Sequence, residues 1–423
     1  MLPQATTIGR LGVVNALFTS TSAVCVTGLS VVDTGTTFTR FGQLVLMVLI
    51  QTGGLGIMTI STLFLMIAGR RVSFSKHDAI QNTFTHTGDR SLSSILKDVA
   101  FFTFVLEGLG VILLFFCFYP ENEVPKALYI AVFHAISAFC NAGFSLFPDS
   151  FTVYRENSLL NLTICFLVLT GGIGFLVLSE LKHRLLSKHR FWSRLSLHSK
   201  LVLLSTSCLL IAGTILILFM EGNNTLAQLS MPHRILSSFF QAVNARTSGF
   251  NTLPLGNMAN ETLFVFILLM FIGASPGSCG GGIKTTTFTT LILLGISRFQ
   301  GQNRPQIFNR SISEKSIEKA VSVLLISTVV VCIGIIILLM TELGDVSHPQ
   351  SRGKFLELFF EVISAFGTVG FTTGITADLS IIGKVIITCI MFVGRLGPLL
   401  VGIALSRSIK YHYFYAEEDI MIG

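Results

Sequence analysis

Gly367-Thr-Val-Gly-Phe-Thr372 is the stretch that decides the fold, because three earlier stretches of the chain are built like it. They are Cys25-Val-Thr-Gly-Leu-Ser30, Cys140-Asn-Ala-Gly-Phe-Ser145 and Arg246-Thr-Ser-Gly-Phe-Asn251. Each stretch centres on one glycine, and the four glycines (Gly28, Gly143, Gly249 and Gly370) follow one another at intervals of 115, 106 and 121 residues. Such near-even spacing indicates a fourfold internal repeat.

The sequence around the four glycines repeats as well. A moderately apolar run precedes each glycine, at residues 13–26, 127–139, 233–245 and 354–366. Each run is too short to cross a hydrocarbon core, which takes about 20 helical residues, but long enough for a half-helix that enters the membrane. A full-length apolar segment follows each glycine, and another precedes the half-helix in repeats two to four. The repeating unit is therefore predicted as helix, half-helix, glycine loop and helix.

The segment after each loop holds a glycine cluster of its own. The clusters are Thr52-Gly-Gly-Leu-Gly56, Thr170-Gly-Gly-Ile-Gly174, Ile272-Gly-Ala-Ser-Pro-Gly277 and Val393-Gly-Arg-Leu-Gly397. We expect the clusters outside the third repeat to allow close helix packing. The repeats are predicted at residues 1–85, 86–190, 191–305 and 306–423. The first repeat lacks a leading helix, and we expect the true N-terminus to lie upstream of Met1, because a missing outer helix would expose polar surface to lipid.

Composition places the chain in a membrane. Of its 423 residues, 51% are hydrophobic and 12% are charged, whereas about 25% are charged in an ordinary soluble domain. Apolar runs at residues 101–118, 201–220, 320–340 and 381–405 have the length and composition of spanning helices. We therefore predict an all-α integral membrane protein in which four pseudo-symmetric helix–pore-helix–glycine-loop–helix repeats surround a central pore.

Basic and acidic residues occupy alternate connections between the apolar segments. The basic residues concerned are Arg70, Arg71, Lys76, Arg90, Lys97, Lys182, Arg184, Lys188, Arg190, Arg194, Lys200, Arg298, Arg304, Arg310, Lys315, Lys319, Arg407 and Lys410, and the intervening connections are acidic. Because cytoplasmic loops are enriched in Lys and Arg, the basic loops and the C-terminus are predicted to be cytoplasmic, in a multi-pass protein of the cell membrane. The net charge of +7 does not indicate a nucleic-acid partner, which would require one basic face.

Four re-entrant glycine loops around one axis are typical of a cation pore. Irregular backbone at membrane depth is tolerated where it lines an aqueous path, and its carbonyl oxygens can replace the hydration shell of a cation. Thr368-Val-Gly-Phe371 comes closest to the TVGYG filter of potassium channels. The predicted ion-binding residues, whose carbonyls would hold K⁺, are Thr27, Gly28, Ala142, Gly143, Ser248, Gly249, Val369 and Gly370. Asp33, Asp149 and Asp378 at the outer mouth would concentrate cations.

These loops, together with Asn244-Ala-Arg-Thr-Ser-Gly-Phe250 and Gly394-Arg-Leu-Gly-Pro398, resemble the Trk/Ktr superfamily of potassium transporters over essentially the whole chain. Without additional N-terminal helices, the chain is more similar to the Ktr membrane subunit, KtrB, than to TrkH. The resemblance implies potassium uptake, often sodium-stimulated in the Ktr branch, by a homodimeric membrane part surrounded by lipid. It also implies a cytoplasmic nucleotide-binding regulatory subunit of the KtrA type. We expect no covalent cofactor.

The third repeat contains an interruption, Gly273-Ala-Ser-Pro-Gly-Ser-Cys-Gly-Gly-Gly-Ile-Lys-Thr-Thr-Thr287, in which the proline and successive glycines cannot sustain a helix. The resemblance implies that this segment lies under the filter and gates it. The candidate gate residues are Gly280, Gly281, Gly282, Lys284 and Arg395. Lys284 would repel potassium, or alternatively snorkel to the cytoplasmic boundary. Arg395, an isolated charge in an apolar run, would line the cavity or alternatively clamp backbone carbonyls.

Three residues beside the loop glycines, Asn141, Arg246 and Thr368, are candidates for supporting the filter. We expect Arg246 to brace the third loop through a carboxylate, for which Glu361 is a candidate. Glu107, inside an apolar run, would pair with a pore-helix group or bind sodium, and we favour the pairing.

Other function classes find less support in the sequence. Gly277-Ser-Cys-Gly-Gly-Gly-Ile-Lys-Thr285 fails the P-loop pattern, because Ile283 separates the lysine from the glycine that it should follow. The eight cysteines are scattered singly, which argues against a metal site, and no catalytic constellation indicates an enzyme. The serious alternative is a secondary transporter that moves another cation or small solute by alternating access. Such folds usually show two inverted halves, whereas four repeats of the same sense favour a pore.

Overall fold

The computed structural model describes residues 3–7, 9–56, 92–185, 191–302, 304–344, 346–347 and 349–397. Within these ranges the protein is almost entirely helical, with one short hairpin of β1 (Gln306–Ile307) and β2 (Arg310–Ser311). Part of the charge pattern lies outside the described residues, namely Arg70, Arg71, Lys76, Arg90, Lys188, Arg190, Arg407 and Lys410. The C-terminus, Pro398 and the end of the last apolar run lie outside them too.

Four short helices lead into the four glycine loops, as the sequence predicts. They are α1 (Val13–Val24), α7 (Val124–Phe139), α12 (Met231–Thr247) and α16 (Lys354–Gly367). Helices α7 and α12 begin before the predicted runs, each with a proline in its first turn. Proline is tolerated there because its missing N–H would have had no partner within the helix.

Three described helices are long and apolar enough to cross a membrane. They are α6 (Leu92–Phe118), α11 (Leu197–Glu221) and α15 (Glu314–Glu342), and each precedes a half-helix. A fourth candidate span is the pair α8 (Ser158–Ile173) and α9 (Phe175–Leu185), which is bent by 97° at the residue between them. These elements make the protein an all-helical membrane protein.

The helices that follow the loops differ from the full-length segments predicted by the sequence. They are α3 (Arg40–Leu55), α8, α13 (Asn260–Phe271) and α17 (Ile381–Leu396). Three of them have 16 residues, a rise of about 24 Å, which is less than the hydrocarbon core of about 30 Å. Each of these three ends at a glycine of its cluster with positive φ: Gly56 (85°), Gly174 (102°) and Gly397 (88°). After Gly174 the chain continues in α9, whereas the residues after Gly56 and Gly397 lie outside the described ranges.

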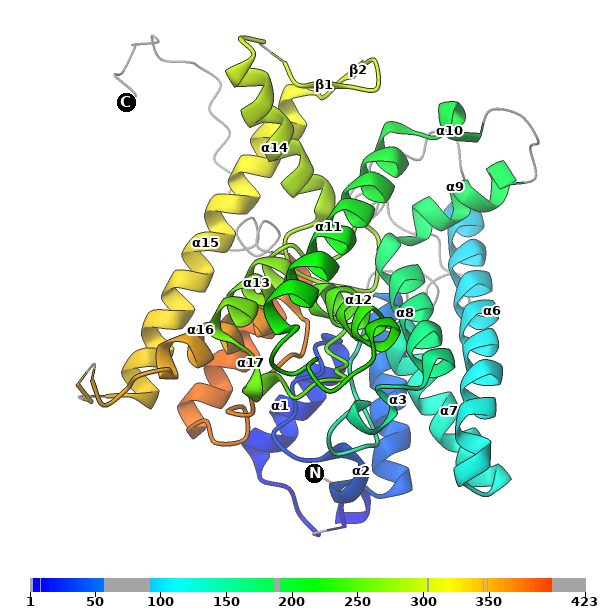
Figure 1. Ribbon diagram of the computed structural model, residues 1–423, viewed down its shortest axis with the longest axis vertical. Helices are drawn as coiled ribbons and strands as arrows, with labels where there is room; N and C mark the ends of the chain where they lie inside the picture. The colour runs from blue at the N-terminus through cyan, green and yellow to red at the C-terminus, as the bar shows by residue number, and fades with distance from the viewer. Residues whose placement is uncertain are drawn as a thin grey trace.

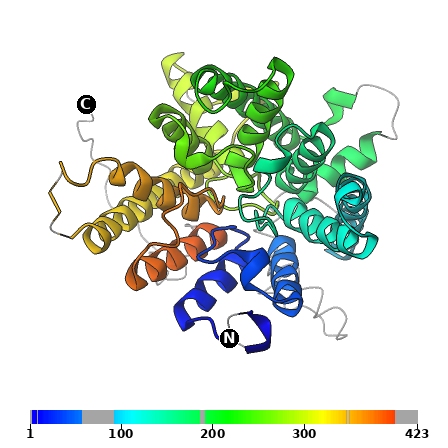
Figure 2. The same cartoon turned by 60° about the horizontal axis from the view of Figure 1, so that its bottom comes forward.

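The repeats close into a ring. Each post-loop helix contacts the half-helix of the next repeat: α3 contacts α7, α8 contacts α12, α13 contacts α16, and α17 contacts α1. Figure 2 shows the result, in which blue, teal, green and orange groups of helices follow one another around a centre. The half-helices are thereby enclosed, and Phe18, Phe133, Phe240 and Phe360 are fully buried.

The glycine clusters allow the close packing that the sequence predicts. A β-carbon on Gly53, Gly171 or Gly394 would overlap a carbonyl oxygen at the end of the half-helix of the same repeat. The oxygens belong to Val24, Phe139 and Phe366 respectively.

Short elements mark the two ends of the molecule. Near one end lie α10 (Phe191–Arg194) and the β1–β2 hairpin that follows α14 (Thr285–Phe299), and near the other lies α2 (Thr34–Thr37) (Figure 1). The remaining elements are short 3₁₀ helices, η1 (Pro3–Ala5), η2 (Tyr119–Glu121), η3 (Thr152–Tyr154) and η4 (Leu255–Asn257).

Candidate functional site

All four loop glycines have a positive φ angle. Their φ angles are 88° at Gly28, 70° at Gly143, 69° at Gly249 and 93° at Gly370. This left-handed region is open to glycine at little cost and is disfavoured for residues with a β-carbon. The glycine in each loop is therefore required by backbone conformation as well as by space.

The loops form a closed ring of carbonyl oxygens. A β-carbon added to Gly28 would overlap the carbonyl oxygen of Ala142, and one on Gly143 would overlap that of Ser248. In the same way Gly249 lies against the oxygen of Val369, and Gly370 lies against that of Thr27. Each glycine thus lies against the residue that precedes the next glycine, and the fourth loop returns to the first. All eight predicted filter residues are brought together.

Local hydrogen bonds shape three of the loops alike. The residue before each glycine donates its N–H to the carbonyl of a half-helix serine: Thr27 to Ser22 (2.8 Å), Ala142 to Ser137 (2.7 Å) and Val369 to Ser364 (2.9 Å). One residue earlier, Val26, Asn141 and Thr368 have positive φ angles of 55°, 58° and 50°. These residues turn the chain sharply out of each half-helix.

The third loop differs from the other three. Val243 replaces the serine of the other half-helices, Thr247 remains in α12, and Ser248 has a φ of −131°. Gly249 instead donates its N–H to the carbonyl of Asn244 at 3.2 Å. The ring is therefore pseudo-symmetric.

The predicted support residues connect the loops to their surroundings. The side chains of Asn141 and Thr247 are hydrogen-bonded at 2.8 Å, which joins the second loop to the third. The Thr368 hydroxyl accepts from the N–H of Gly281 at 2.9 Å. The fourth loop is thereby attached to the interrupted segment of the third repeat.

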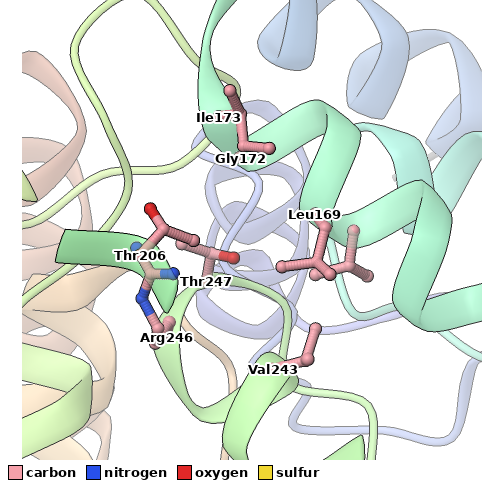
Figure 3. Close-up of a pocket in the computed structure, with 8 residues that line it drawn as sticks. Leu169, Gly172, Ile173, Thr206, Val243, Arg246 and Thr247 are labelled. Carbon is pink, nitrogen blue, oxygen red and sulfur yellow. The ribbon is translucent and has the colours of Figure 1, made fainter. Parts of the chain in front are cut away.

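Arg246 makes a different contact from the one expected. It donates to the carbonyl of Gly273 at 3.5 Å, and no Arg246–Glu361 ion pair occurs among the described side chains. Oε1 of Glu361 instead accepts from the hydroxyls of Thr372 and Thr376, whereas its Oε2 has no hydrogen-bond partner among the described residues. Figure 3 shows the guanidinium near Thr206 and Thr247, beside a small cavity that Leu169, Val243 and Ile173 also line.

The interruption, predicted at residues 273–287, is observed at residues 272–284, and the last three predicted residues begin α14 instead. Ile272 and Ile283 form an isolated parallel bridge, so the segment folds back on itself. It is also hydrogen-bonded to the second repeat, because the N–H groups of Ser275 and Cys279 donate to the carbonyls of Gly172 and Gly171, both at 3.1 Å. Gly280, Gly281 and Gly282 are buried.

The two candidate gate cations both bind backbone carbonyls. Lys284 donates from Nζ to Gly280 at 2.7 Å and is half-buried, so its ammonium folds back onto the segment. Arg395 donates to the carbonyls of Cys279 and Gly53. Arg395 therefore clamps two backbone carbonyls, and one of them belongs to the interrupted segment.

Two further acidic positions have structural partners. Glu107 is buried and accepts from the Gln51 side chain at 2.9 Å; Gln51 lies in α3, which follows the first loop, and not on a pore helix as expected. Asp33 accepts from the N–H groups of Gly35 (2.7 Å) and Thr36 (3.3 Å) and caps α2. Asp149 and Asp378 are exposed.

The fold, with four loops in a ring among membrane helices, defines a membrane transport protein. The family model for TrkH, described as a cation transport protein, matches residues 2–412. The chain therefore belongs to the TrkH family of cation transport proteins, which confirms the Trk/Ktr resemblance.

Individual relatives agree with this assignment. The chain is 40% identical to the Ktr system potassium uptake protein B of Bacillus subtilis (strain 168), over 100% of this chain and 92% of that protein. It is 36% identical to the potassium/sodium uptake protein NtpJ of Enterococcus hirae, over 97% and 90% of the two chains. The potassium transporter TrkH from Vibrio parahaemolyticus shares the fold, with a TM-score of 0.72 at 17% identity, over 94% and 79% of the two chains.

Proposed function

We propose that this chain takes up potassium across the cell membrane, and that the ion passes through the ring of four glycine loops. The observation that carries the proposal is the closed sequence of contacts in which each loop glycine lies against the carbonyl of the residue before the next glycine. Such a ring offers a dehydrated cation several oxygen ligands at once. Two full-length relatives whose names describe potassium or potassium/sodium uptake support this choice of ion.

The filter in this proposal consists of Thr27, Gly28, Ala142, Gly143, Ser248, Gly249, Val369 and Gly370. The third loop departs from the geometry of the others, so its ligands are less regular than those of a filter with four identical loops. Sodium stimulation is part of the proposal, since one relative is named for both ions.

The gate in this proposal is the segment at residues 272–284, held by Thr368 and Arg395. Hydrogen bonds attach it to the fourth loop, to α8 and to α17. A buried segment next to the ring closes the pathway until it moves. Gly280, Gly281 and Gly282 supply the backbone freedom that such a movement requires.

The proposed partners follow from the names of the relatives. A Ktr system protein works within a system of several components, and we propose a cytoplasmic nucleotide-binding subunit of the KtrA type and a homodimeric membrane part. Helices α9 and α10 and the β1–β2 hairpin, which include the basic residues Lys182, Arg194 and Arg310, lie near one end of the molecule (Figure 1). That end and the C-terminus face the cytoplasm in this proposal.

The experiment that tests the proposal is potassium uptake in cells that lack their own potassium transporters. The chain should restore growth at low potassium and should carry current through single open channels. A rocking transporter would give uptake without single-channel currents, and that result would favour alternating access. Absence of uptake even with a regulatory subunit supplied would reject potassium as the substrate.

A further inference from the structure

Two half-helices carry an ionisable side chain nine residues before the loop glycine. These residues are His134 in α7 and Glu361 in α16, and both are fully buried. The same position is Thr19 in α1 and Phe240 in α12, also buried. The position faces protein in all four repeats, but only repeats two and four place an ionisable group there.

His134 connects its half-helix to the outer side of the second loop. Its Nε2 lies 3.2 Å from the Ser145 hydroxyl and accepts from the N–H of Leu146 at 3.3 Å. Because a backbone N–H can only donate, Nε2 is the unprotonated nitrogen. The proton is then on Nδ1, which donates to the Ile130 carbonyl at 2.9 Å. A neutral imidazole thus joins α7 to the residues just beyond Gly143.

Glu361 makes the corresponding connection in the fourth repeat. Its carboxylate accepts from the hydroxyls of Thr372 and Thr376, the latter at 2.9 Å. The two hydroxyls are themselves 2.8 Å apart. Ser145 and Thr372 both lie two residues after their loop glycine. A histidine in one repeat and a glutamate in the other therefore connect the half-helix to the equivalent loop position.

The residue at this position makes no such connection in the other two repeats, although in the third repeat the neighbouring Gln241 accepts from the N–H groups of Thr252 (3.2 Å) and Leu253 (3.1 Å) once its side-chain amide is correctly oriented. The Thr19 hydroxyl donates to Asn15 within its own helix at 2.9 Å, and Phe240 has no polar atom to offer. In the ring the first loop touches the second, the second the third, the third the fourth and the fourth the first. The loops that His134 and Glu361 connect therefore face each other across the ring.

We infer that His134 and Glu361 are positioning residues that hold opposite loops at the spacing needed to distinguish potassium from sodium. This inference rests on the proposed function. Burying a polar side chain costs free energy even when it is hydrogen-bonded, and a well-packed apolar residue is often the more stable choice. A buried ionisable group at both positions is therefore better explained by loop geometry than by stability.

The test measures potassium uptake and its inhibition by sodium in cells that lack other potassium transporters, normalised to the amount of protein in the membrane. His134→Leu and Glu361→Leu remove the acceptors, whereas His134→Gln and Glu361→Gln keep an acceptor near the same place. Ser145→Ala and Thr372→Val remove only the partner hydroxyl. They therefore allow the ion preference to be measured even if a leucine variant does not insert into the membrane. Thr19→Val and Phe240→Leu are the matched controls at the same helix position.

We expect the leucine and hydroxyl-deleting variants to lose potassium-over-sodium preference by about tenfold, as for one lost buried hydrogen bond. The glutamine variants should retain most of the preference, and the two controls should match the wild type. Wild-type uptake with an unchanged ion preference in Ser145→Ala, Thr372→Val and the leucine variants would overturn the inference and leave the proposed function standing. Absence of uptake by the wild type would instead reject the proposed function.

Discussion

The guanidinium of Arg395 donates a hydrogen bond to the carbonyl oxygen of Cys279, 116 residues earlier in the chain. This bond ties α17 of the fourth repeat to the interrupted segment of the third. A second bond from the same guanidinium reaches Gly53 in the first repeat. A charge in an apolar helix costs roughly 2.5–3.5 kcal/mol on insertion, and the carbonyl oxygens offset part of that cost. Arg395 therefore joins three repeats beside the candidate gate.

Replacing Arg395 should release the interrupted segment. We expect Arg395→Ala to raise potassium uptake per membrane-inserted molecule by several-fold without a regulatory subunit, because both carbonyl contacts disappear. Uptake of a radioactive potassium analogue in transporter-deficient cells, with protein quantified by immunoblot, measures the effect. Arg298→Ala, at an exposed position of α14, is the control. Unchanged uptake per molecule in Arg395→Ala would mean that the contacts are structural only.

Shortening the segment should have a related effect. Deleting residues 280–282 removes the bond from Gly281 to Thr368 and the carbonyl that Lys284 binds. We expect higher basal flux with potassium-over-sodium preference retained, because the eight ring residues remain. Flux at the wild-type level would argue against a gate, and lost preference would indicate that the segment forms part of the filter.

The sequence predicts the repeating architecture well because its signals are local. The half-helix of the fourth repeat is predicted at residues 354–366 and observed as Lys354–Gly367. The loop glycines are also recognisable, because a left-handed φ at each of them requires that residue type. The interruption in the third repeat follows from Pro276 and its neighbouring glycines for the same reason.

What the sequence does not predict depends on contacts between distant segments. The expected pairing of Arg246 with Glu361 is not formed: Arg246 donates to the Gly273 carbonyl, and Glu361 accepts from the hydroxyls of Thr372 and Thr376. The carbonyl partners of Arg395 carry no side-chain signal in the sequence. The end of α8 at Gly174 could have been predicted from the sequence, because glycine at this position allows the positive φ that ends the helix.

Glu221 should be important for stability. It is fully buried at the C-terminal end of α11 and accepts from the N–H of Ala259 at 2.9 Å and the Thr262 hydroxyl at 2.6 Å. These bonds attach α11 to the start of α13, so Glu221→Ala should cost about 2–3 kcal/mol, as for a lost hydrogen bond to a charged group. Thermal unfolding of the purified protein in detergent should show a lower midpoint.

The matched control for this substitution is Glu261→Ala, which removes an exposed glutamate in the first turn of α13. Its unfolding midpoint should remain within about 1 °C of the wild type, since surface substitutions rarely exceed 0.5 kcal/mol. Equal midpoints for Glu221→Ala and Glu261→Ala would show that the buried carboxylate is not a clamp.

The central claim is that the four-glycine ring selects the transported ion. The most direct test compares potassium and sodium flux into vesicles containing the wild type, Gly249→Ser or the control Gly108→Ala. A β-carbon on Gly249 overlaps the Val369 carbonyl, whereas one on Gly108 meets no neighbouring atom within 4 Å. We predict that the wild type and Gly108→Ala prefer potassium and that Gly249→Ser loses most of this preference. Wild-type ion preference in correctly inserted Gly249→Ser would contradict the account.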